Sequence, residues 1–357
     1  MNENEMFDLN GVRTLPQGDA SAPAIRYGGW MPTPFGCTPP NVSEYTPFAD
    51  PPPITGNEVF LWEAAYRANR DKFPPFNWQL TGSCVQGGYF NNLIILMAQE
   101  VVNLPQPEAF IQPFCFHTYG LSRYLGFGAT TEGEGSFGMA MAQAGSEGGV
   151  SFVDDPEIDK PHICGPACVW DAPTELKWSS IRNHPAGLKE RSKKYTVKYV
   201  RCRTTDQVKD HLRRRHPLTW AGDWGGQGSG VVRGTQFPIL TMPRRETWNH
   251  QQSCWGFWEH PELSTRYYIQ NQWWNPGTTK YTLRDRSIWT ITQPGIARPM
   301  HGDPPIITVD GWNHTPFPQG GYWVAESDMA YQCSTGEVCA TVLFDGATGR
   351  EIGLGNI

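Results

Sequence analysis

The feature of this sequence that most restricts its fold is the number of residues that break regular structure. The chain of 357 residues contains 38 glycines and 31 prolines, about a fifth of the total. Glycine weakens helices and proline stops them, so both gather in turns and loops. We therefore expect a mixed fold with many turns and long ordered loops, and the composition excludes a helical bundle.

Composition and charge exclude several further classes of protein. Hydrophobic residues make up 39% of the chain and aromatic residues 13%, which is enough apolar side chain for a packed core. The 29 lysines and arginines against 35 aspartates and glutamates leave a net charge of −6, whereas nucleic-acid binding needs a basic excess. The apolar run at residues 93–98 is far shorter than the roughly 18 residues that span a bilayer. We expect neither a nucleic acid nor a membrane as partner.

The N-terminus and the cysteines indicate a reducing location. The first residues form neither the basic segment nor the apolar segment of a secretory signal. The nine cysteines are odd in number and scattered, which is not typical of a disulfide framework. We expect no signal peptide and a location in the cytoplasm or within a protein assembly.

Residues 1–57 differ from the rest of the chain. They contain ten of the prolines and show neither a helical nor an alternating apolar period. Proline-rich segments of this kind adopt extended, polyproline-like conformations. We predict an extended N-terminal arm that either wraps the body of the protein, residues 58–357, or binds a protein partner.

Hydrophobic periodicity predicts helices first and strands later. A strong helical period starts after Ser83, a good N-cap residue, and one stripe that includes Val85 and Tyr89 is expected to be buried. The predicted helices cover residues 58–70, 83–102, 136–143 and 205–214. The predicted strands cover residues 218–221, 250–259, 266–270, 287–292 and 321–325. This order indicates an α+β fold.

Cys84 begins the longest predicted helix. The positive end of a helix dipole favours thiolate over thiol at this position. The backbone N–H of Cys84 lacks a helical partner there, and the side-chain amide of Gln79 lies five residues earlier, so the two form a candidate oxyanion hole. A buried structural cysteine after a turn is the alternative reading, and this segment alone favours neither.

His250 and Asn271 are the candidate partners of this thiol. His250 opens a predicted strand, and only tertiary structure can bring it to Cys84. Asn271 follows the next strand, and its side-chain carbonyl would accept from an imidazole N–H and fix the tautomer. Trp273 would shield that hydrogen bond from water. Taken alone, a single histidine and an asparagine turn are more often structural.

The order of these motifs resembles that of the papain-like cysteine peptidases. The matching active-centre residues are Gln79, Gly82, Ser83, Cys84, His250, Asn271 and Trp273. Further positions outside the active centre also resemble the family pattern: Gly135, Ala140, Gly148, Gly149, Val150, residues 205–220, Gly321 and Tyr322. The resemblance covers residues 78–325, and the chain is identified on it as a divergent member of that family.

The resemblance implies a fold and a function. It implies a helical subdomain at about residues 58–200, an antiparallel, barrel-like subdomain at about 201–357, and an active-site cleft between them. It further implies a thiol protease that hydrolyses peptide or protein substrates through a Cys84, His250 and Asn271 triad, with Gln79 in the oxyanion hole. The backbone of Gly135 would pair with an extended substrate. No cofactor is implied.

Several positions depart from the family pattern. Gln79 is five rather than six residues before Cys84, and Val85 stands where the family has tryptophan. Thr81 and Glu132 stand where the family has a pair of disulfide-bonded cysteines. The N-terminal arm also lacks the long charged helical pattern of the family's inhibitory propeptide.

These departures leave two other functions open. In the first, the fold is kept, with little or no turnover, as a structural or binding component of a multi-protein particle, a viral one included. Alternatively, the same cysteine and histidine scaffold serves a cell-wall peptide hydrolase or amidase. A metal site at His162, Cys164 and Cys168 has no second ligand pair at a suitable spacing, so we expect no metal.

Overall fold

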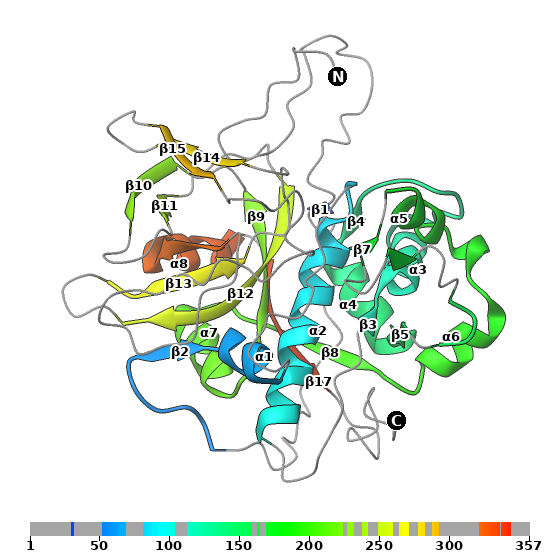
Figure 1. Cartoon of the computed structure of the whole chain (residues 1–357), viewed down its shortest axis with the longest axis horizontal. Helices are drawn as coiled ribbons and strands as arrows, with labels where there is room; N and C mark the ends of the chain where they lie inside the picture. The colour runs from blue at the N-terminus through cyan, green and yellow to red at the C-terminus, as the bar shows by residue number, and fades with distance from the viewer. Residues whose placement is uncertain are drawn as a thin grey trace.

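The structure is a computed structural model of the whole chain, coloured along the sequence in Figure 1. It describes residues 30–31, 52–68, 81–103, 113–153, 155–158, 163–164, 169–170, 172–223, 227–231, 238–241, 249–259, 264–270, 278–282, 288–292, 321–335 and 337–343. The helices are α1 (Trp62–Ala68), α2 (Cys84–Asn103), α3 (Phe116–Phe127), α4 (Gly138–Glu147), α5 (Ala172–Trp178), α6 (Ala186–Ser192), α7 (Thr205–Arg213), α8 (Glu326–Thr335) and the 3-10 helix η3 (Ile181–Asn183).

The strands form one large sheet and several two-stranded pairs. The large sheet contains β2 (Glu58–Phe60), β8 (Val197–Arg201), β9 (Leu218–Asp223), β10 (Gln227–Val231), β11 (Pro238–Thr241), β12 (Asn249–Trp258), β13 (Arg266–Gln270), β16 (Gly321–Ala325) and β17 (Glu337–Leu343). The two-stranded pairs are β1 (Trp30–Met31) with β4 (Ser136–Phe137), β3 (Pro113–Phe114) with β5 (Ser151–Phe152), β6 (Ile163–Cys164) with β7 (Val169–Trp170), and β14 (Thr278–Thr282) with β15 (Ile288–Thr292).

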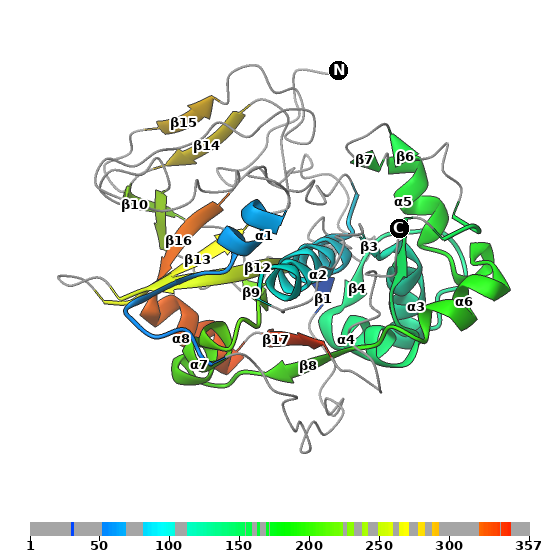
Figure 2. The ribbon, with the colours of Figure 1, turned by 60° about the horizontal axis from the view of Figure 1, so that its bottom comes forward.

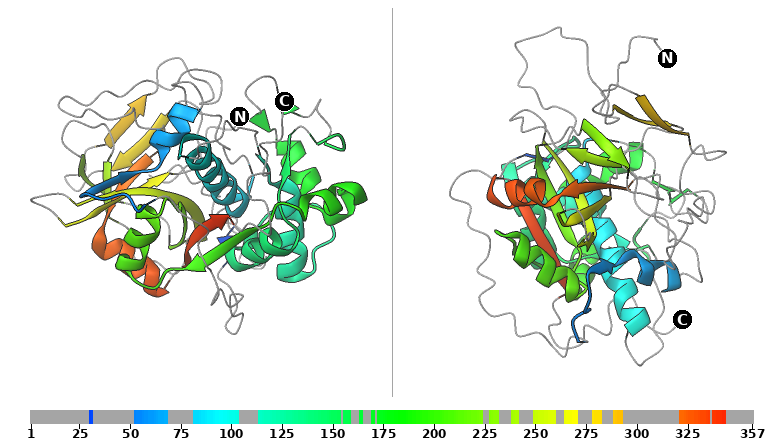
Figure 3. Two further views of the ribbon diagram at one scale, coloured as in Figure 1. Left: turned by 90° about the horizontal axis from the view of Figure 1, so that it is seen from below. Right: turned by 90° about the vertical axis from the view of Figure 1, so that its left-hand side faces the viewer.

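The architecture is a mixture of helices and a mainly antiparallel sheet, as the sequence predicts. The sheet runs in the order β10-β11-β16-β13-β12-β9-β17-β8, with β2 on β12, and its one parallel pair is β11 with β16. Helices α1 and α2 cover one face of the sheet, and α7 and α8 cover the other (Figures 2 and 3). The remaining helices, α3 to α6, lie on the far side of α2 from most of the sheet (Figure 1).

Helix α2 is the centre of the core. Its side chains are buried from Cys84 through Gln99 on every face, and these include the polar Gln86, Asn91 and Asn92. The prediction of a single buried stripe is therefore wrong. The reason is that α2 packs against β12, β9 and β17 on one side and against α3 and α4 on the other, so no face is left for water.

The later helix and five of the strands are predicted well. Helix α7 begins after Thr204, whose hydroxyl accepts a hydrogen bond from Gln207 N at 3.3 Å, and it buries Val208 and Leu212. Strands β9, β12, β13, β15 and β16 coincide with the five predicted strands to within two residues at each end. The dominant signal in these segments is a short run of aromatic and β-branched residues between turn residues, which is typical of strands whose two faces are both covered.

Two predicted helix starts are wrong. Residues 58–60 form β2, which pairs with the end of β12, and helix α1 begins only at Trp62. Residues 136–137 form β4, and α4 runs from Gly138 to Glu147. Gly145 lies inside α4, and only glycine fits there without a shift because a Cβ at this position would clash with the hydroxyl of Tyr89.

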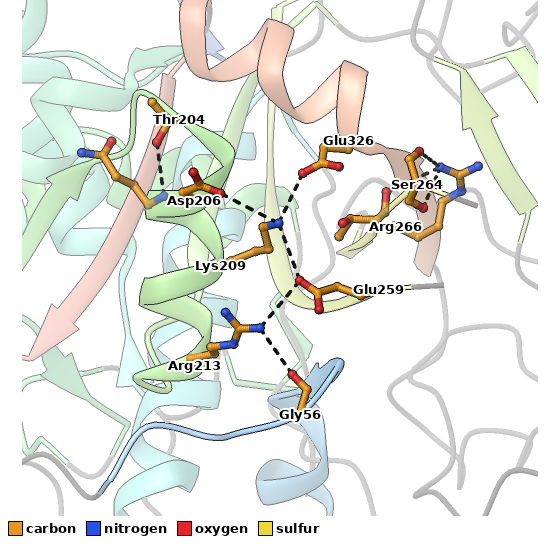
Figure 4. A network of polar contacts seen from close by, with 11 residues as sticks. Gly56, Thr204, Asp206, Lys209, Arg213, Glu259, Ser264, Arg266 and Glu326 are labelled. Atoms are coloured by element: carbon orange, nitrogen blue, oxygen red, sulfur yellow. Dashed lines mark hydrogen bonds and ion pairs between the residues drawn. The ribbon is translucent and has the colours of Figure 1, made fainter. Parts of the chain in front are cut away.

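The end of the N-terminal arm, residues 52–57, lies against α7. The peptide N–H of Ile54 donates to Arg213 O at 2.8 Å, and the side chain of Arg215 donates to Pro52 O at 2.8 Å. Arg213 also donates to Gly56 O at 3.3 Å and lies 3.6 Å from Glu259 (Figure 4). This part of the arm therefore packs on the body of the protein.

The same network continues to α8. Lys209 on α7 is 16% exposed and lies within 4 Å of three carboxylates, those of Glu326, Glu259 and Asp206 (Figure 4). It therefore joins α7 to the start of α8 and to the end of β12.

No helix among the described residues combines the length and the apolar composition that crossing a lipid bilayer requires.

Candidate active site

The start of α2 meets the start of β12. The backbone N–H of Gln251 donates to Cys84 Sγ over 3.4 Å, and the side chain of Gln251 donates to Val85 O over 3.4 Å. Cys84 is the first residue of α2, and His250 is the residue next to Gln251 on β12. Two of the residues that the sequence singles out, Cys84 and His250, thus lie on elements that touch at this point.

Gly88, one helical turn after Cys84, permits this approach. A Cβ at Gly88 would lie 3.2 Å from the backbone oxygen of Gln252, which is tighter than ordinary packing. The carbonyl oxygen of Gly88 accepts a hydrogen bond from Ser253 Oγ at 3.1 Å. The absence of a side chain at Gly88 thus lets the backbone of β12 approach α2 closely.

Both candidate groups are buried. Cys84 has an exposed fraction of 0% and His250 of 4%, and His250 pairs with Gly222 of β9 in the sheet. A charge in such surroundings is stable only when it is paired with an opposite charge or hydrogen-bonded. A carbonyl group can reach the sulfur only after some part of the surrounding structure moves.

The loop before Cys84 is held from the helical side. The carbonyl of Gly82 accepts hydrogen bonds from Gly135 N at 2.9 Å and from the hydroxyl of Tyr119 at 3.2 Å. A Cβ at Gly82 would come within 2.9 Å of the side chain of Glu134, so only glycine fits without a shift. The peptide group of Cys84 therefore begins α2 in a fixed orientation.

Gly135, predicted to bind substrate through its backbone, adopts a left-handed conformation with φ of 82°. Its N–H donates to Gly82 O, and its carbonyl accepts from Arg123 Nε at 3.3 Å. The next two residues form β4, on which β1 adds a parallel strand, with Trp30 opposite Ser136. Strand β1 also lies against β12. An extended segment of the chain thus runs between the elements that carry Gly135 and His250.

The other predicted site residues, Gln79, Asn271 and Trp273, lie outside the described residues. The residue before Asn271 is Gln270, which ends β13 and pairs with Ser253 of β12. The oxyanion and orienting roles of Gln79 and Asn271 therefore stay predictions.

Thr81 and Glu132, which stand at the positions of the disulfide-bonded cysteines in the family that the sequence resembles, have separate polar partners. Thr81 Oγ1 donates to the carboxylate of Glu175 at 2.6 Å. Glu132 Oε1 accepts from Asn183 Nδ2 at 3.2 Å. Both partners belong to the segment from α5 to η3, so hydrogen bonds connect the two positions to one neighbouring segment.

Glu175 and Tyr119 are the residues near Cys84 that sequence reasoning misses. Glu175 lies on the short helix α5, where a glutamate is usually solvent-exposed, and Tyr119 lies on a helix that the sequence pattern does not predict. Neither segment has a local signal that connects it to the Cys84 loop, because both contacts are made by tertiary folding.

In the part of the chain that the structure describes, no group of three or more histidine, cysteine or acidic side chains is arranged so that it could hold a metal ion. Strands β6 and β7 pair Cys164 with Val169, while His162 and Cys168 lie outside the described residues.

Burial raises the pKa of the Cys254 and Cys333 thiols to about 12, which keeps them protonated and unreactive.

The chain is similar to solved structures of papain-like cysteine proteases. It is 13% identical to xylellain, a cysteine protease from Xylella fastidiosa, covering 89% of this chain and 95% of that one with a TM-score of 0.47. It is 11% identical to digestive procathepsin L 3 of Tenebrio molitor larval midgut, covering 88% and 74% with a TM-score of 0.42. For the bromelain protease of Ananas comosus the identity is 10%, the coverage 81% and 100%, and the TM-score 0.40.

No family model matches the chain, and no curated protein matches it. The identities and TM-scores of these solved structures are too low to assign their activity to this chain.

Proposed function

We propose that this chain is a cysteine peptidase in which Cys84 is the nucleophile and His250 the general acid and base. The observation that supports this most is the contact between Gln251 N and Cys84 Sγ, since Gln251 directly follows His250 on β12. Asn271 orients the imidazole, and Gln79 with the Cys84 N–H binds the oxyanion. Trp273 shields the pair, in a cleft between a helical and a barrel-like subdomain.

The reaction has two stages. The Cys84 thiolate attacks the carbonyl carbon of a peptide bond, and the C–N bond breaks as imidazolium His250 gives its proton to the leaving amine. Water, deprotonated by His250, then attacks the thioester, and the C–S bond breaks to release the carboxylic acid and restore the Cys84 thiolate and imidazolium His250. No cofactor or metal takes part, because every proton moves between the imidazole, the amine and water.

An extended peptide is the substrate class that the surroundings support. Strand β1 occupies the β4 edge beside Gly135, so an extended peptide that displaced β1 would pair with the same edge through backbone hydrogen bonds. Because Cys84 has no exposed surface, part of the surrounding structure moves before a substrate reaches the sulfur. The arm at residues 1–57 then acts either as a cover of the site or as the part that binds a protein partner.

The test is replacement of Cys84 by alanine. We expect Cys84→Ala to abolish both peptide hydrolysis and labelling by an epoxide thiol probe. Cys254→Ala, on β12 in the same core, is the matched control and should keep both activities. Hydrolysis that survives Cys84→Ala would reject the proposal. A panel that includes peptidoglycan stem peptides distinguishes a protein peptidase from a cell-wall peptide hydrolase or amidase.

The complete burial of Cys84 favours a second candidate function, a binding module without turnover. In that case the protein is a stoichiometric component of a multi-protein particle, and the arm contacts its neighbours. Deletion of residues 1–50, which keeps the part docked on α7, would then disturb the assembly, whereas Cys84→Ala would not. The opposite pattern supports the peptidase.

A further inference from the structure

The carboxylate of Glu175 is buried directly beside the loop that leads into Cys84. Glu175 has an exposed fraction of 0%. One oxygen, Oε2, accepts three hydrogen bonds: from Thr81 N at 3.1 Å, from Thr81 Oγ1 at 2.6 Å and from Ser83 Oγ at 3.0 Å. All three donors lie in the three residues before Cys84, and all are buried.

We propose, on the basis of the proposed function, that Glu175 is a positioning residue that sets the nucleophile of this peptidase. It acts through Thr81 and Ser83, whose conformation determines where Cys84 Sγ and the Cys84 N–H lie at the first turn of α2. Glu175 itself touches neither the sulfur nor the substrate in this role.

A carboxylate is suited to this position for two reasons. Hydrogen bonds to an ionised acceptor are shorter and about twice as strong as neutral ones, and the 2.6 Å bond from Thr81 is of this kind. A negative charge is also stabilised near the N-terminus of a helix, here that of α2, whose first turn contains no acidic residue.

Glu175 is itself fixed by a closed ring of hydrogen bonds. Its carbonyl accepts from Ser179 N at 3.1 Å, and the carbonyl of Ser179 accepts from Arg123 Nη1 at 2.9 Å. Arg123 Nε donates to Gly135 O at 3.3 Å, and Gly135 N donates to Gly82 O at 2.9 Å, which returns to the loop before Cys84. The ring ties α3, α5 and the strand-binding edge at β4 to the Cys84 loop.

The precision of this loop matters because reaction rates fall steeply with misplacement. A displacement of about 1 Å at a reacting group lowers the rate roughly a hundredfold. The chain enters α2 through the residues from Thr81 to Cys84. The hydrogen bonds to Glu175 fix Thr81 and Ser83 within this segment. Loss of one hydroxyl donor should therefore reduce turnover more than substrate binding.

The variants that test this are Thr81→Val, Thr81→Ser and Glu175→Gln, made in the full-length chain. Thr81→Val keeps the shape and removes the hydroxyl, and Thr81→Ser keeps the hydroxyl. We expect Thr81→Val and Glu175→Gln to lower kcat at least tenfold with KM within threefold, and Thr81→Ser to stay within threefold in both. Glu147→Gln, an exposed glutamate bonded to Gln143, is the control and should be unchanged.

The pH profile of Cys84 alkylation by iodoacetamide, followed by mass spectrometry, gives a readout that does not require turnover. Thr81→Val removes one hydrogen-bond donor to the Glu175 carboxylate. The negative charge is then less compensated, which disfavours the Cys84 thiolate, so the midpoint pH of alkylation should rise. Glu175→Gln removes the charge and should move it downward. If the midpoint shifts in the same direction in Thr81→Val and Glu175→Gln, the proposal is overturned, because a mere loosening of the Cys84 loop would shift both variants alike.

Each outcome separates the two proposals. If the wild-type chain hydrolyses no peptide, the proposed function fails, and the opposite alkylation shifts still test the positioning role. If hydrolysis occurs but folded Thr81→Val and Glu175→Gln keep wild-type kcat and alkylation profiles, the positioning role is overturned and the peptidase stands. An equal loss in Thr81→Ser and Thr81→Val also overturns it. If Glu175→Gln does not fold, the Thr81 pair decides alone.

Discussion

Trp255 on β12 donates its indole N–H to Oδ1 of Asn92 on α2 over 3.0 Å, and both side chains are fully buried. Asn92 lies eight residues after Cys84, about 12 Å along a helix. Trp255 lies four residues after Gln251, about 13 Å along a strand. The two spacings are nearly equal. The contact between Trp255 and Asn92 and the contact between Gln251 and Cys84 therefore hold α2 and β12 side by side in one register.

Asn92→Ala should destabilise the protein. The side chain also donates to Thr341 Oγ1 at 3.0 Å, so the change leaves a buried indole N–H and a buried hydroxyl without this partner. Each loss costs about 1–3 kcal/mol, and we expect the free energy of unfolding in urea to fall by about 2–4 kcal/mol. Asn103→Ala, at the end of the same helix, is the control and should change it by less than about 1 kcal/mol. Equal losses in the two variants would contradict the role of Asn92.

Met31→Pro should make Cys84 more accessible. Strand β1 pairs with β4 and lies against β12, and proline is poorly tolerated within a paired strand. We expect the rate of Cys84 labelling by an epoxide thiol probe to rise at least tenfold, while Met31→Ala leaves it close to the wild-type rate. An unchanged rate in Met31→Pro would show that β1 does not limit access to the sulfur.

Acid should destabilise the protein through a pair of buried histidines on the helical side. Burial, with a smaller effect of the neighbouring His184, lowers the pKa of His117 to about 3, and burial lowers that of His184 to about 4. Both are neutral in the folded state, whereas the unfolded chain takes up protons below about pH 6.5. Stability is therefore lost as pH falls from about 6.5 toward 3.

For His117 alone this linkage amounts to about 2 kcal/mol between pH 7 and pH 5. Urea unfolding at the two pH values measures it. In His117→Asn the loss between pH 7 and pH 5 should be smaller by about that amount, even if the variant is less stable at pH 7. A variant with the full wild-type loss would assign the acid sensitivity to other groups.

Lys209→Met should lower stability in a salt-dependent way. Lys209 lies within 4 Å of three carboxylates that connect α7, α8 and the end of β12. Because the site is partly exposed, we expect a loss of about 1 kcal/mol at low ionic strength. In 1 M NaCl the Debye length is about 3 Å, so the difference from wild type should shrink by about half or more. Lys193→Met, which removes one exposed pair with Glu190, should have no measurable effect.

The sequence predicts those elements whose signals are local. Helix α7 is predicted because Thr204 caps it and its apolar period is regular, and β12 and β13 because apolar and aromatic residues follow each other in short runs. Cys84 and His250 are found because a thiol at a helix start and a histidine at a strand start have recognisable chemistry. The resemblance to a known family connects these two positions, which composition and periodicity do not.

The features that sequence reasoning misses depend on contacts between distant segments. Residues 58–60 form a strand only because β12 offers them an edge. Strand β1 lies in a proline-rich segment without a period, and its pairing with Ser136 is a property of the folded chain. Glu175 acquires its role from Thr81, which is far away in sequence, and no residue near either one indicates the contact.

We propose that the register of α2 against β12 pairs the Cys84 thiol with the His250 imidazole. The most direct measurement is the pH dependence of Cys84 alkylation in the wild-type chain and in His250→Ala, followed for each cysteine by mass spectrometry. We expect alkylation of wild-type Cys84 well below the ordinary thiol pKa of about 8.5, a shift of the midpoint to that value or above in His250→Ala, and no labelling of buried Cys254 in either. A wild-type profile with an ordinary thiol midpoint that His250→Ala leaves unchanged would contradict it.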